Sequence, residues 1–163
     1  MKALLLMRHA KSSWKDGSLD DHDRPLKKRG RRAAPRMGRL LADEQLVPDL
    51  VLTSTAVRAV ETGSAVVEAC GYGGPVHTLG ELYLATPESY VAALRRLGNE
   101  AERILVVGHN PGLEALVDGL SGRQVELPTA AIALLHLPIE RWTGVALDRN
   151  GTLDHVWTPK SLE

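Results

Sequence analysis

The sequence has little of what would place it in several large classes of protein. Its 163 residues include one cysteine, Cys70, and no phenylalanine. A lone cysteine excludes an internal disulfide framework and fits a reducing compartment. No apolar run reaches the roughly 18 residues that a membrane-spanning helix needs. The stretch Ala3–Met7 is also too short for the apolar region of a signal peptide. We therefore expect a cytoplasmic protein without a membrane partner.

Net charge is absent too, because 20 Lys and Arg residues balance 20 Asp and Glu residues. A neutral chain has no overall field that would attract nucleic acid. The basic run KKRGRR at 27–32 has acidic residues just upstream and helical spacing, which favours a solvated helix face over a nucleic-acid site. The composition, 44% hydrophobic and 25% charged, is typical of a globular protein. The length predicts a single domain over 1–163.

Short apolar runs without alternation predict buried strands. Such runs are typical of a parallel sheet that helices cover on both faces. Segments of helical periodicity separate them, so we predict an α/β fold with a mainly parallel sheet. The strands are expected at Ala3–Met7, Leu50–Thr53, Ile104–Val107 and Ile132–Leu137, with a weaker one at Val76–Leu79. The helices are expected at Leu26–Glu44, Thr55–Ala69, Pro87–Leu97 and Pro111–Leu120.

Two finer expectations follow from local pattern. The second helix should stop at Gly71 and pack one apolar face, made of Val57, Val60, Ala65 and Val67. Near the end of the chain, Asn150-Gly151 lies between two β-prone runs, which predicts a β-hairpin.

Polar side chains follow three of the predicted strands. Arg8, His9 and Ser12 come after the first, Arg58 lies one turn into the helix after the second, and His109 follows Ile104–Val107. In open parallel sheets, ligands bind at the carboxyl ends of the strands. We therefore expect these side chains to share one site.

Arginines, histidines and a helix start suit a phosphoryl group. Guanidinium groups match phosphate oxygens in a bidentate way, and a helix N-terminus adds N–H donors. No acidic cluster suited to magnesium accompanies them, so we expect no metal and no cofactor. A neutral imidazole can attack phosphorus, and water can hydrolyse the resulting phosphohistidine. His9 is the better placed nucleophile, His109 the phosphate ligand, and Glu81 the candidate proton donor and later base.

Each of these residues also has an ordinary explanation. His9 and His109 could be hydrogen-bonded histidines at strand ends, and Glu81 a solvated loop carboxylate. Arg24 could pair with an acidic neighbour, Asp20, Asp21 or Asp23. A metal site on the two histidines would need carboxylate or cysteine ligands at metal spacing, which the sequence lacks.

Three segments, LMRHAKS, TSTAVRAVET and VVGHNPG, resemble the histidine phosphatase superfamily, whose namesake motif is Arg-His-Gly. The segment HDRPLKKRG resembles the short branch typified by the phosphohistidine phosphatase SixA. The resemblance covers nearly the whole chain in the right order, although Ala10 stands where the motif has glycine. It implies a phosphoglycerate mutase-like fold, a three-layer α/β/α sandwich.

The resemblance also implies roles. His9 would be the phosphorylated nucleophile, and Glu81 lies where the wider superfamily has its acid. The expected phosphate- and substrate-binding residues are Arg8, Arg24, Arg58, His109 and Ser12. We expect a metal-independent phosphatase that acts on phosphohistidine in a protein. The alternatives are a phosphatase of small phosphate esters, such as sugar or nucleotide phosphates, and a low-turnover module that binds phosphate or a phosphoprotein.

Overall fold

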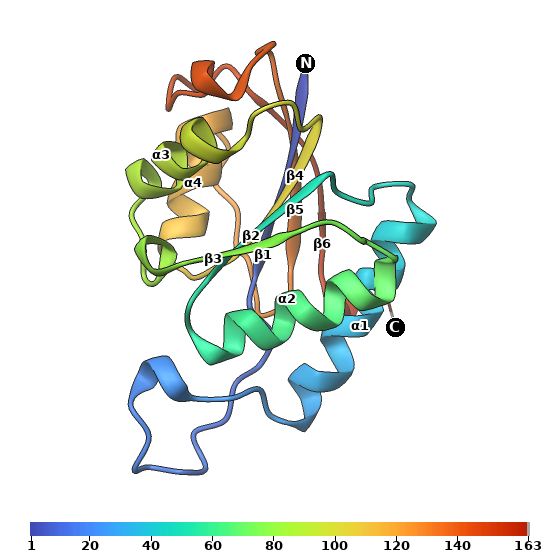
Figure 1. Ribbon diagram of the computed structural model, residues 1–163, viewed down its shortest axis with the longest axis vertical. Helices are drawn as coiled ribbons and strands as arrows, with labels where there is room; N and C mark the ends of the chain where they lie inside the picture. Colours follow the sequence, from blue (N-terminus) through green and yellow to red (C-terminus); the bar gives the residue numbers. More distant parts are fainter. Residues whose placement is uncertain (163) are drawn as a thin grey trace.

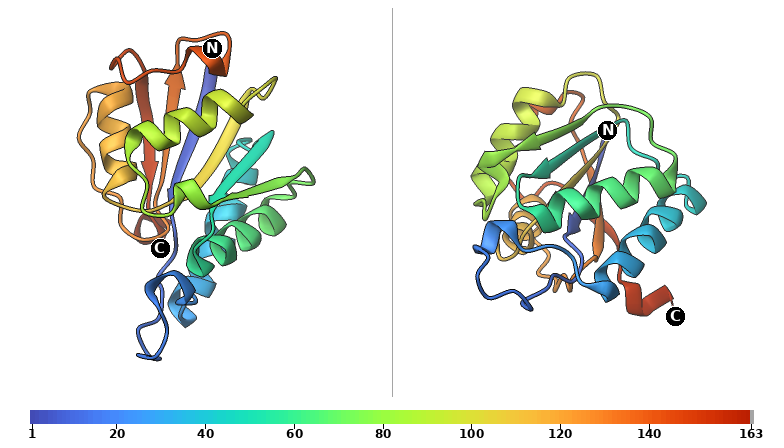
Figure 2. Two further views of the ribbon diagram at one scale, coloured as in Figure 1. Left: turned by 60° about the vertical axis from the view of Figure 1, so that its left-hand side comes forward. Right: turned by 60° about the horizontal axis from the view of Figure 1, so that its bottom comes forward.

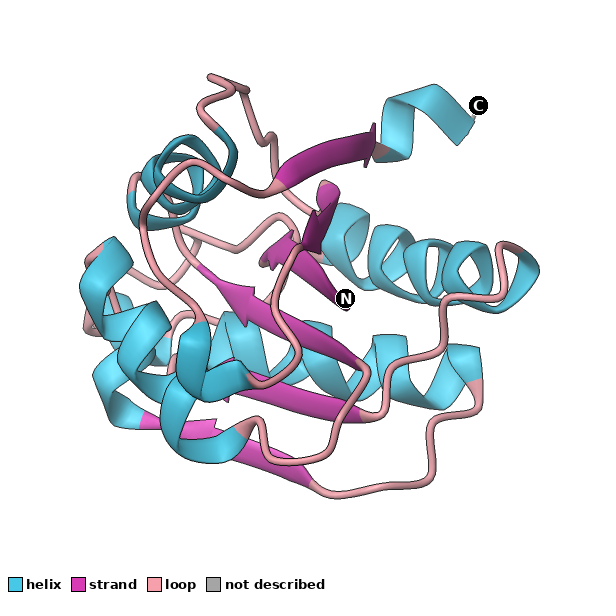
Figure 3. Cartoon of the chain, turned by 90° about the horizontal axis from the view of Figure 1, so that it is seen from above, coloured by secondary structure: helices cyan, strands magenta, loops and turns pink. Residues whose placement is uncertain are grey.

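In the computed structural model, which describes residues 1–162, a six-stranded sheet lies between two pairs of helices (Figure 1). The strands are β1 (Lys2–Arg8), β2 (Leu50–Ser54), β3 (Val76–Leu79), β4 (Arg103–Gly108), β5 (Ile132–Leu137) and β6 (Thr152–Trp157). The helices are α1 (Lys28–Asp43), α2 (Val57–Cys70), α3 (Pro87–Leu97) and α4 (Gly112–Ser121). The short 3-10 turns are η1 (Asp21–Asp23), η2 (Gly80–Leu82), η3 (Trp142–Gly144) and η4 (Pro159–Leu162). Figure 3 shows helices on both sides of the strands, and the predicted three-layer α/β/α fold is confirmed.

The sheet is mixed but mainly parallel. Its strand order is β3-β2-β4-β1-β5-β6, in which β5 alone runs opposite to the other five strands and so pairs antiparallel with both β1 and β6. In the register of the central pair, Arg8 of β1 lies opposite Gly108 of β4. The residues that follow these strands, His9 and His109, therefore leave the sheet side by side.

The apolar run of β1 is buried on both faces of the sheet. Leu4 and Leu6 pack into the core beneath α3 and α4, whereas Leu5 and Met7 pack into the core beneath α1 and α2. A strand covered by helices on both faces has no solvent side, which is why this segment shows no alternation.

The predicted packing face of α2 is wrong in part, because Ala65 and Val67 pack against the core but Val60 does not. The buried residues of the helix are Arg58, Ala59, Thr62, Gly63, Val66 and Cys70, whereas Val60 is 39% exposed. Gly63 lets the helix approach the sheet, because a Cβ there would lie 2.9 Å from Thr53 Cγ2. The inward face carries polar residues that reach the site described below, so its apolar pattern is weak. The predicted stop is confirmed, since Gly71 caps the helix with φ 80°.

The predicted hairpin around Asn150-Gly151 is also wrong. The stretch before it forms η3 and bends, and β6 pairs with β5 instead. Trp142 is fully buried and its indole N–H donates to the carbonyl of Ala101 across 2.7 Å. The amide of Gly151 donates to the carbonyl of Leu120 at the end of α4, across 2.8 Å. The conformation of this segment is therefore determined by tertiary packing and not by local turn propensity.

The loop between β1 and α1 extends beyond the carboxyl edge of the sheet (Figure 2). A bridge between Ser12 and Leu26 closes its base, and Arg58 Nη1 donates to the Asp21 carbonyl across 2.7 Å. This loop therefore stands next to the ends of β1 and β4. Within residues 1–162, no helix is both long and apolar enough to cross a membrane.

Candidate active site

His9 and His109 face each other at the carboxyl edge of the sheet. The parallel pairing of β1 and β4 continues one residue further, because the His9 amide donates to the Gly108 carbonyl across 3.1 Å. The two ring centroids lie 5.2 Å apart. Their residues are only 7% and 2% exposed, respectively. The structure thus brings the two predicted histidines together.

Two of the predicted arginines lie beside these rings. Arg58, 3% exposed, stands in the first turn of α2 with Nε 3.4 Å from His9 Nε2 and Nη2 3.5 Å from His109 Nδ1. Arg8 donates from Nη1 to the Leu127 carbonyl across 3.2 Å. Its Nε is buried without a hydrogen-bond partner among the described residues. Arg8 is among the residues that line the pocket described below.

Arg24 and Ser12 come from the projecting loop. Arg24 Nη1 donates to Ser12 Oγ across 2.8 Å, and its guanidinium lies 3.3 Å above the ring centroid of Trp14. Trp14 is itself 73% exposed. The cation–π contact with Trp14 holds the Arg24 guanidinium on the side of the loop that faces His9 and His109.

These side chains surround a pocket of about 220 Å³. Its lining residues are Arg8, His9, Lys11, Ser12, Trp14, Arg24, Arg58, Leu84, His109, Asn110 and Thr129. The lining carries four cationic side chains and no carboxylate, which suits an anion. Among residues 1–162, no three His, Cys, Asp or Glu side chains are grouped closely enough to hold a metal ion.

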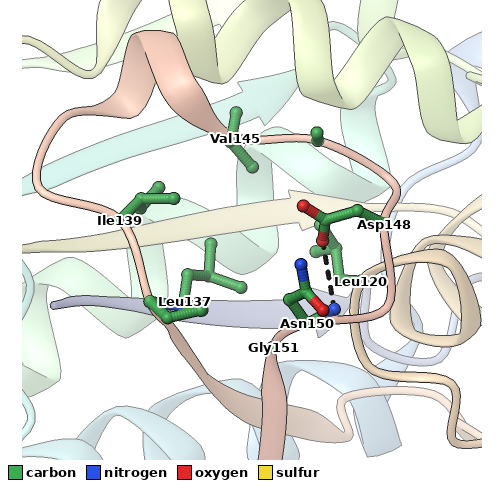
Figure 4. A pocket seen from close by; sticks show the side chains of 9 residues that line it. Leu120, Leu137, Ile139, Val145, Asp148, Asn150 and Gly151 are labelled. Carbon is green, nitrogen blue, oxygen red and sulfur yellow. Dashed lines mark hydrogen bonds between the residues drawn. The ribbon is translucent and has the colours of Figure 1, made fainter.

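Other hollows lie at the opposite edge of the sheet. The pocket in Figure 4, about 50 Å³, is lined by Leu137 and Asp148, and Leu137 pairs with Lys2 at the start of β1. A larger hollow of about 440 Å³ includes Lys2 and Glu102. In both, carboxylates face the space, so neither matches the anion-binding character of the pocket at His9.

His9 is held with one nitrogen fixed and the other free. Its Nδ1 lies 2.8 Å from the Ala10 carbonyl, which can only accept, so Nδ1 carries the proton. Burial, and then the positive charges of Arg58, Arg8 and Arg24, lower the pKa of His9 to about 4 against the opposing Ala10 hydrogen bond. The ring is therefore neutral at pH 7, with the lone pair of Nε2 next to Arg58.

His109 is neutral for similar reasons. Burial, followed by the nearby His9 and Arg58, lowers its pKa to about 3. Ser54 Oγ lies 2.6 Å from His109 Nε2 and already accepts from the Ala56 amide across 3.1 Å. Arg58 Nη2, which can only donate, lies 3.5 Å from His109 Nδ1, so Nδ1 accepts and the ring proton resides on Nε2, which donates to Ser54 Oγ.

Asp21, one of the three acidic neighbours predicted as a possible surface partner of Arg24, also contacts Arg58 at the site. Its carboxylate accepts from Arg24 Nη2 across 3.0 Å, from Arg58 Nη2 across 2.9 Å, and from the Tyr83 hydroxyl across 2.5 Å. The Tyr83 hydrogen bond and the two arginines hold the pKa of this carboxyl well below its usual range. One carboxylate therefore engages both guanidinium groups.

Thr62 is a second residue that sequence reasoning missed. Its hydroxyl accepts from the Ala10 amide across 2.9 Å and donates to the Arg58 carbonyl across 2.6 Å. It thus ties the residue after His9 to the turn of α2 that carries Arg58. The available signal was its spacing, one helical turn after Arg58 on the same face.

Glu81 is the one predicted site residue that the structure does not bring to the pocket. It lies in η2, its carboxylate forms an ion pair with Arg96, and it is absent from the pocket lining. Hydrogen bonding to Arg96 lowers the pKa of Glu81, which favours the ionised form. The structure gives no contact between this carboxylate and His9.

Comparison with known proteins identifies chains of similar sequence and fold. The model of the histidine phosphatase superfamily (branch 1) matches residues 4–83. An uncharacterised protein of Mycobacterium tuberculosis is 37% identical over 142 residues, which cover 80% of this chain and 87% of that protein.

Two solved structures share the whole fold. The protein histidine phosphatase SixA, in complex with tungstate, superimposes with a TM-score of 0.84 at 26% identity and 99% coverage of both chains. A protein described as a phosphohistidine phosphatase SixA, from Agrobacterium tumefaciens, gives 0.82 at 28% identity, over 97% of this chain and 99% of that one.

Fold, pocket and relatives together define a phosphatase. The chain belongs to the histidine phosphatase superfamily, as the sequence motifs indicated.

Proposed function

We propose that this phosphatase works through a phosphohistidine on His9, without a metal ion, and that its substrate is phosphohistidine in a protein. The observation that carries the proposal is the state of His9: a buried, neutral imidazole whose unprotonated Nε2 faces a pocket lined by three arginines. The solved SixA structures, described as phosphohistidine phosphatases, support the choice of substrate.

In the first step, His9 Nε2 attacks phosphorus. A P–N bond to His9 forms as the bond from phosphorus to the leaving group breaks, and the bonding electrons depart with the leaving group. The imidazole of His9 becomes positively charged, and its Nδ1 proton stays hydrogen-bonded to the Ala10 carbonyl. That carbonyl therefore stabilises the charge that develops on the ring.

The arginines compensate the negative charge that spreads over the phosphoryl oxygens. Arg58 already lies beside Nε2, and Arg8 lines the same pocket. His109 also lines this pocket and is a further predicted phosphate ligand. These groups are held before the substrate arrives, which is what gives such donors their effect on rate.

In the second step, water attacks phosphorus and the P–N bond to His9 breaks. The electron pair returns to Nε2, which restores the neutral imidazole, and inorganic phosphate leaves as the dihydrogen form with both protons of the attacking water. Arg24 and Ser12, at the loop side of the pocket, are assigned to the outer oxygens of the phosphoryl group.

The choice of phosphohistidine rests on the leaving group. Glu81 is paired with Arg96, and the pocket lining contains no carboxylic acid that could protonate an alkoxide. An imidazole whose second nitrogen is protonated leaves phosphorus as a neutral molecule and needs no acid. A phosphohistidine substrate therefore fits this pocket better than a phosphate ester.

A direct comparison of substrates tests the proposal. The purified protein is assayed in EDTA with a histidine-phosphorylated carrier protein and with a panel of sugar and nucleotide phosphates, and kcat/KM values are compared. We expect the phosphohistidine protein to be preferred and EDTA to have no effect. A higher kcat/KM for any small ester would overturn the substrate assignment, and loss of activity in EDTA would overturn metal independence.

A further inference from the structure

A second pocket adjoins the phosphate pocket. It measures about 230 Å³ and is lined by Lys11, Arg29, Ala33, Pro128, Thr129, Thr158, Pro159 and Lys160. Lys11 and Thr129 also line the pocket at His9, so the two spaces share a wall. Figure 2 shows the C-terminal turn η4 beside α1, where this pocket lies.

The α1 side of this pocket is tightly built. A Cβ at Gly30 would overlap the carbonyl oxygen of Lys11, so only glycine permits this approach of α1. The same carbonyl accepts from the Lys27 amide across 3.0 Å. The backbone of Lys11 is therefore fixed against the first turn of α1, which brings Arg29 to the same space.

The opposite side is fixed by the C-terminal turn. The Thr158 amide donates to Ser161 Oγ and the Ser161 amide to Thr158 Oγ1, each across 3.1 Å. Leu162 packs against the core beneath α1 and α2. Lys160 lies between these anchors, so the turn that carries its charge is held in place.

The charges of this pocket are all positive. Lys11, Arg29 and Lys160 line it, none of its lining residues is acidic, and none of the three forms an ion pair with another residue in 1–162. We infer that this pocket binds a second anionic group, a phosphate or carboxylate, of the same substrate whose phosphoryl group lies at His9. The inference rests on the proposed function for the position of the first group.

The ligand is thus a substrate with two separated anionic groups. The apolar surfaces of Ala33, Pro128 and Pro159 leave room for a short uncharged spacer between them. In a phosphoprotein, the second group is an acidic side chain near the phosphohistidine. In a small molecule, it is a second phosphate. Both sources present the same chemistry to the three cations.

Binding of non-hydrolysable compounds tests the inference without turnover. Alkane-diyl bisphosphonates of increasing length and the matched alkyl monophosphonates are titrated calorimetrically into the wild type. At the best length we expect the bisphosphonate to bind about five- to tenfold more tightly, the effect of one or two partly exposed ion pairs. R29E and K160E should each reduce this preference while leaving monophosphonate affinity nearly unchanged.

R39E is the matched control, because Arg39 is an exposed cation of α1 that lines neither pocket. Phosphohistidine peptides flanked by glutamate or by glutamine form a second series, compared by kcat/KM. A preference for the more anionic member in either series, lost in R29E and kept in R39E, supports the pocket and identifies the source of the second group. No preference in both series, or an equal loss in R39E, overturns it. Because the phosphonates are not hydrolysed, their affinities can be interpreted even if the proposed mechanism at His9 fails.

Discussion

Arg58 Nε donates to His9 Nε2 across 3.4 Å, so a permanent positive charge lies beside the unprotonated nitrogen of a buried histidine. The two residues come from different segments, the end of β1 and the first turn of α2. Thr62 holds the segments together by bonding to the Ala10 amide and the Arg58 carbonyl. The nucleophile and its nearest cation are therefore fixed relative to each other before substrate binds.

Arg58→Ala should reduce rate far more than stability. It removes a preorganised donor to the phosphoryl oxygens, and such a loss costs on the order of 10²–10³ in kcat. Steady-state kinetics with a generic phosphomonoester and thermal unfolding would be measured together. Arg96→Ala is the control, since Arg96 forms its ion pair with Glu81 and lies outside the pocket. Collapse of the fold in Arg58→Ala would make this residue structural.

The strand-end arrangement of this site was predictable because one physical rule governs it. An unbroken apolar run such as Ala3–Met7 belongs to a strand buried on both faces, and residues after parallel strands meet at one edge. That rule brings His9 and His109 together without any knowledge of loops. The family motifs pointed to the same edge.

What the sequence could not indicate depends on contacts between distant segments. The inward face of α2 carries Arg58 and Thr62 for the site, so a search for apolar spacing missed these two residues and included the exposed Val60. The contact of Asp21 with Arg58 depends on the path of the projecting loop, which no periodicity encodes. Burial of Trp142 likewise overrode the hairpin signal of Asn150-Gly151.

Glu81→Gln should leave the rate on phosphohistidine substrates within about twofold, the range of a surface ion pair. The carboxylate is paired with Arg96 and lines no part of the phosphate pocket. The measurement is kcat/KM for a phosphohistidine peptide, with the same assay on an alkyl phosphate. A large loss on both substrates would show that Glu81 moves into the pocket during turnover.

The pH dependence of kcat/KM should follow the protonation of His9. Burial lowers its pKa to about 4, so the neutral nucleophile predominates above that pH and is lost as pH falls through it. We therefore expect an acidic limb near pH 4 rather than near 6.5, the ordinary value for histidine. The profile is measured with an aryl phosphate as the substrate, because phosphohistidine is itself acid-labile. A limb near 6.5 would mean that His9 is solvated in the free enzyme.

Asp21→Asn should tighten the binding of inorganic phosphate. The Asp21 carboxylate, 41% exposed, engages guanidinium groups of Arg24 and Arg58 that also face the phosphate pocket. Asparagine keeps a hydrogen-bond acceptor but removes the negative charge, so product inhibition should strengthen by up to about fivefold. The measurement is the inhibition constant for phosphate in Asp21→Asn, compared with the wild type and with Asp20→Asn as a control. Weaker inhibition would show that Asp21 is needed to hold the arginines in place.

The most direct test of the account is the identity of the phosphorylated atom. The protein is mixed with a phosphorylated substrate, quenched within milliseconds under alkaline conditions, and digested for mass spectrometry and phosphorus NMR. We expect acid-labile phosphate on His9, at Nε2, because Nδ1 donates to the Ala10 carbonyl. We also expect no phosphate and no turnover in His9→Ala. Phosphate on another residue, or undiminished turnover in His9→Ala, would contradict the mechanism.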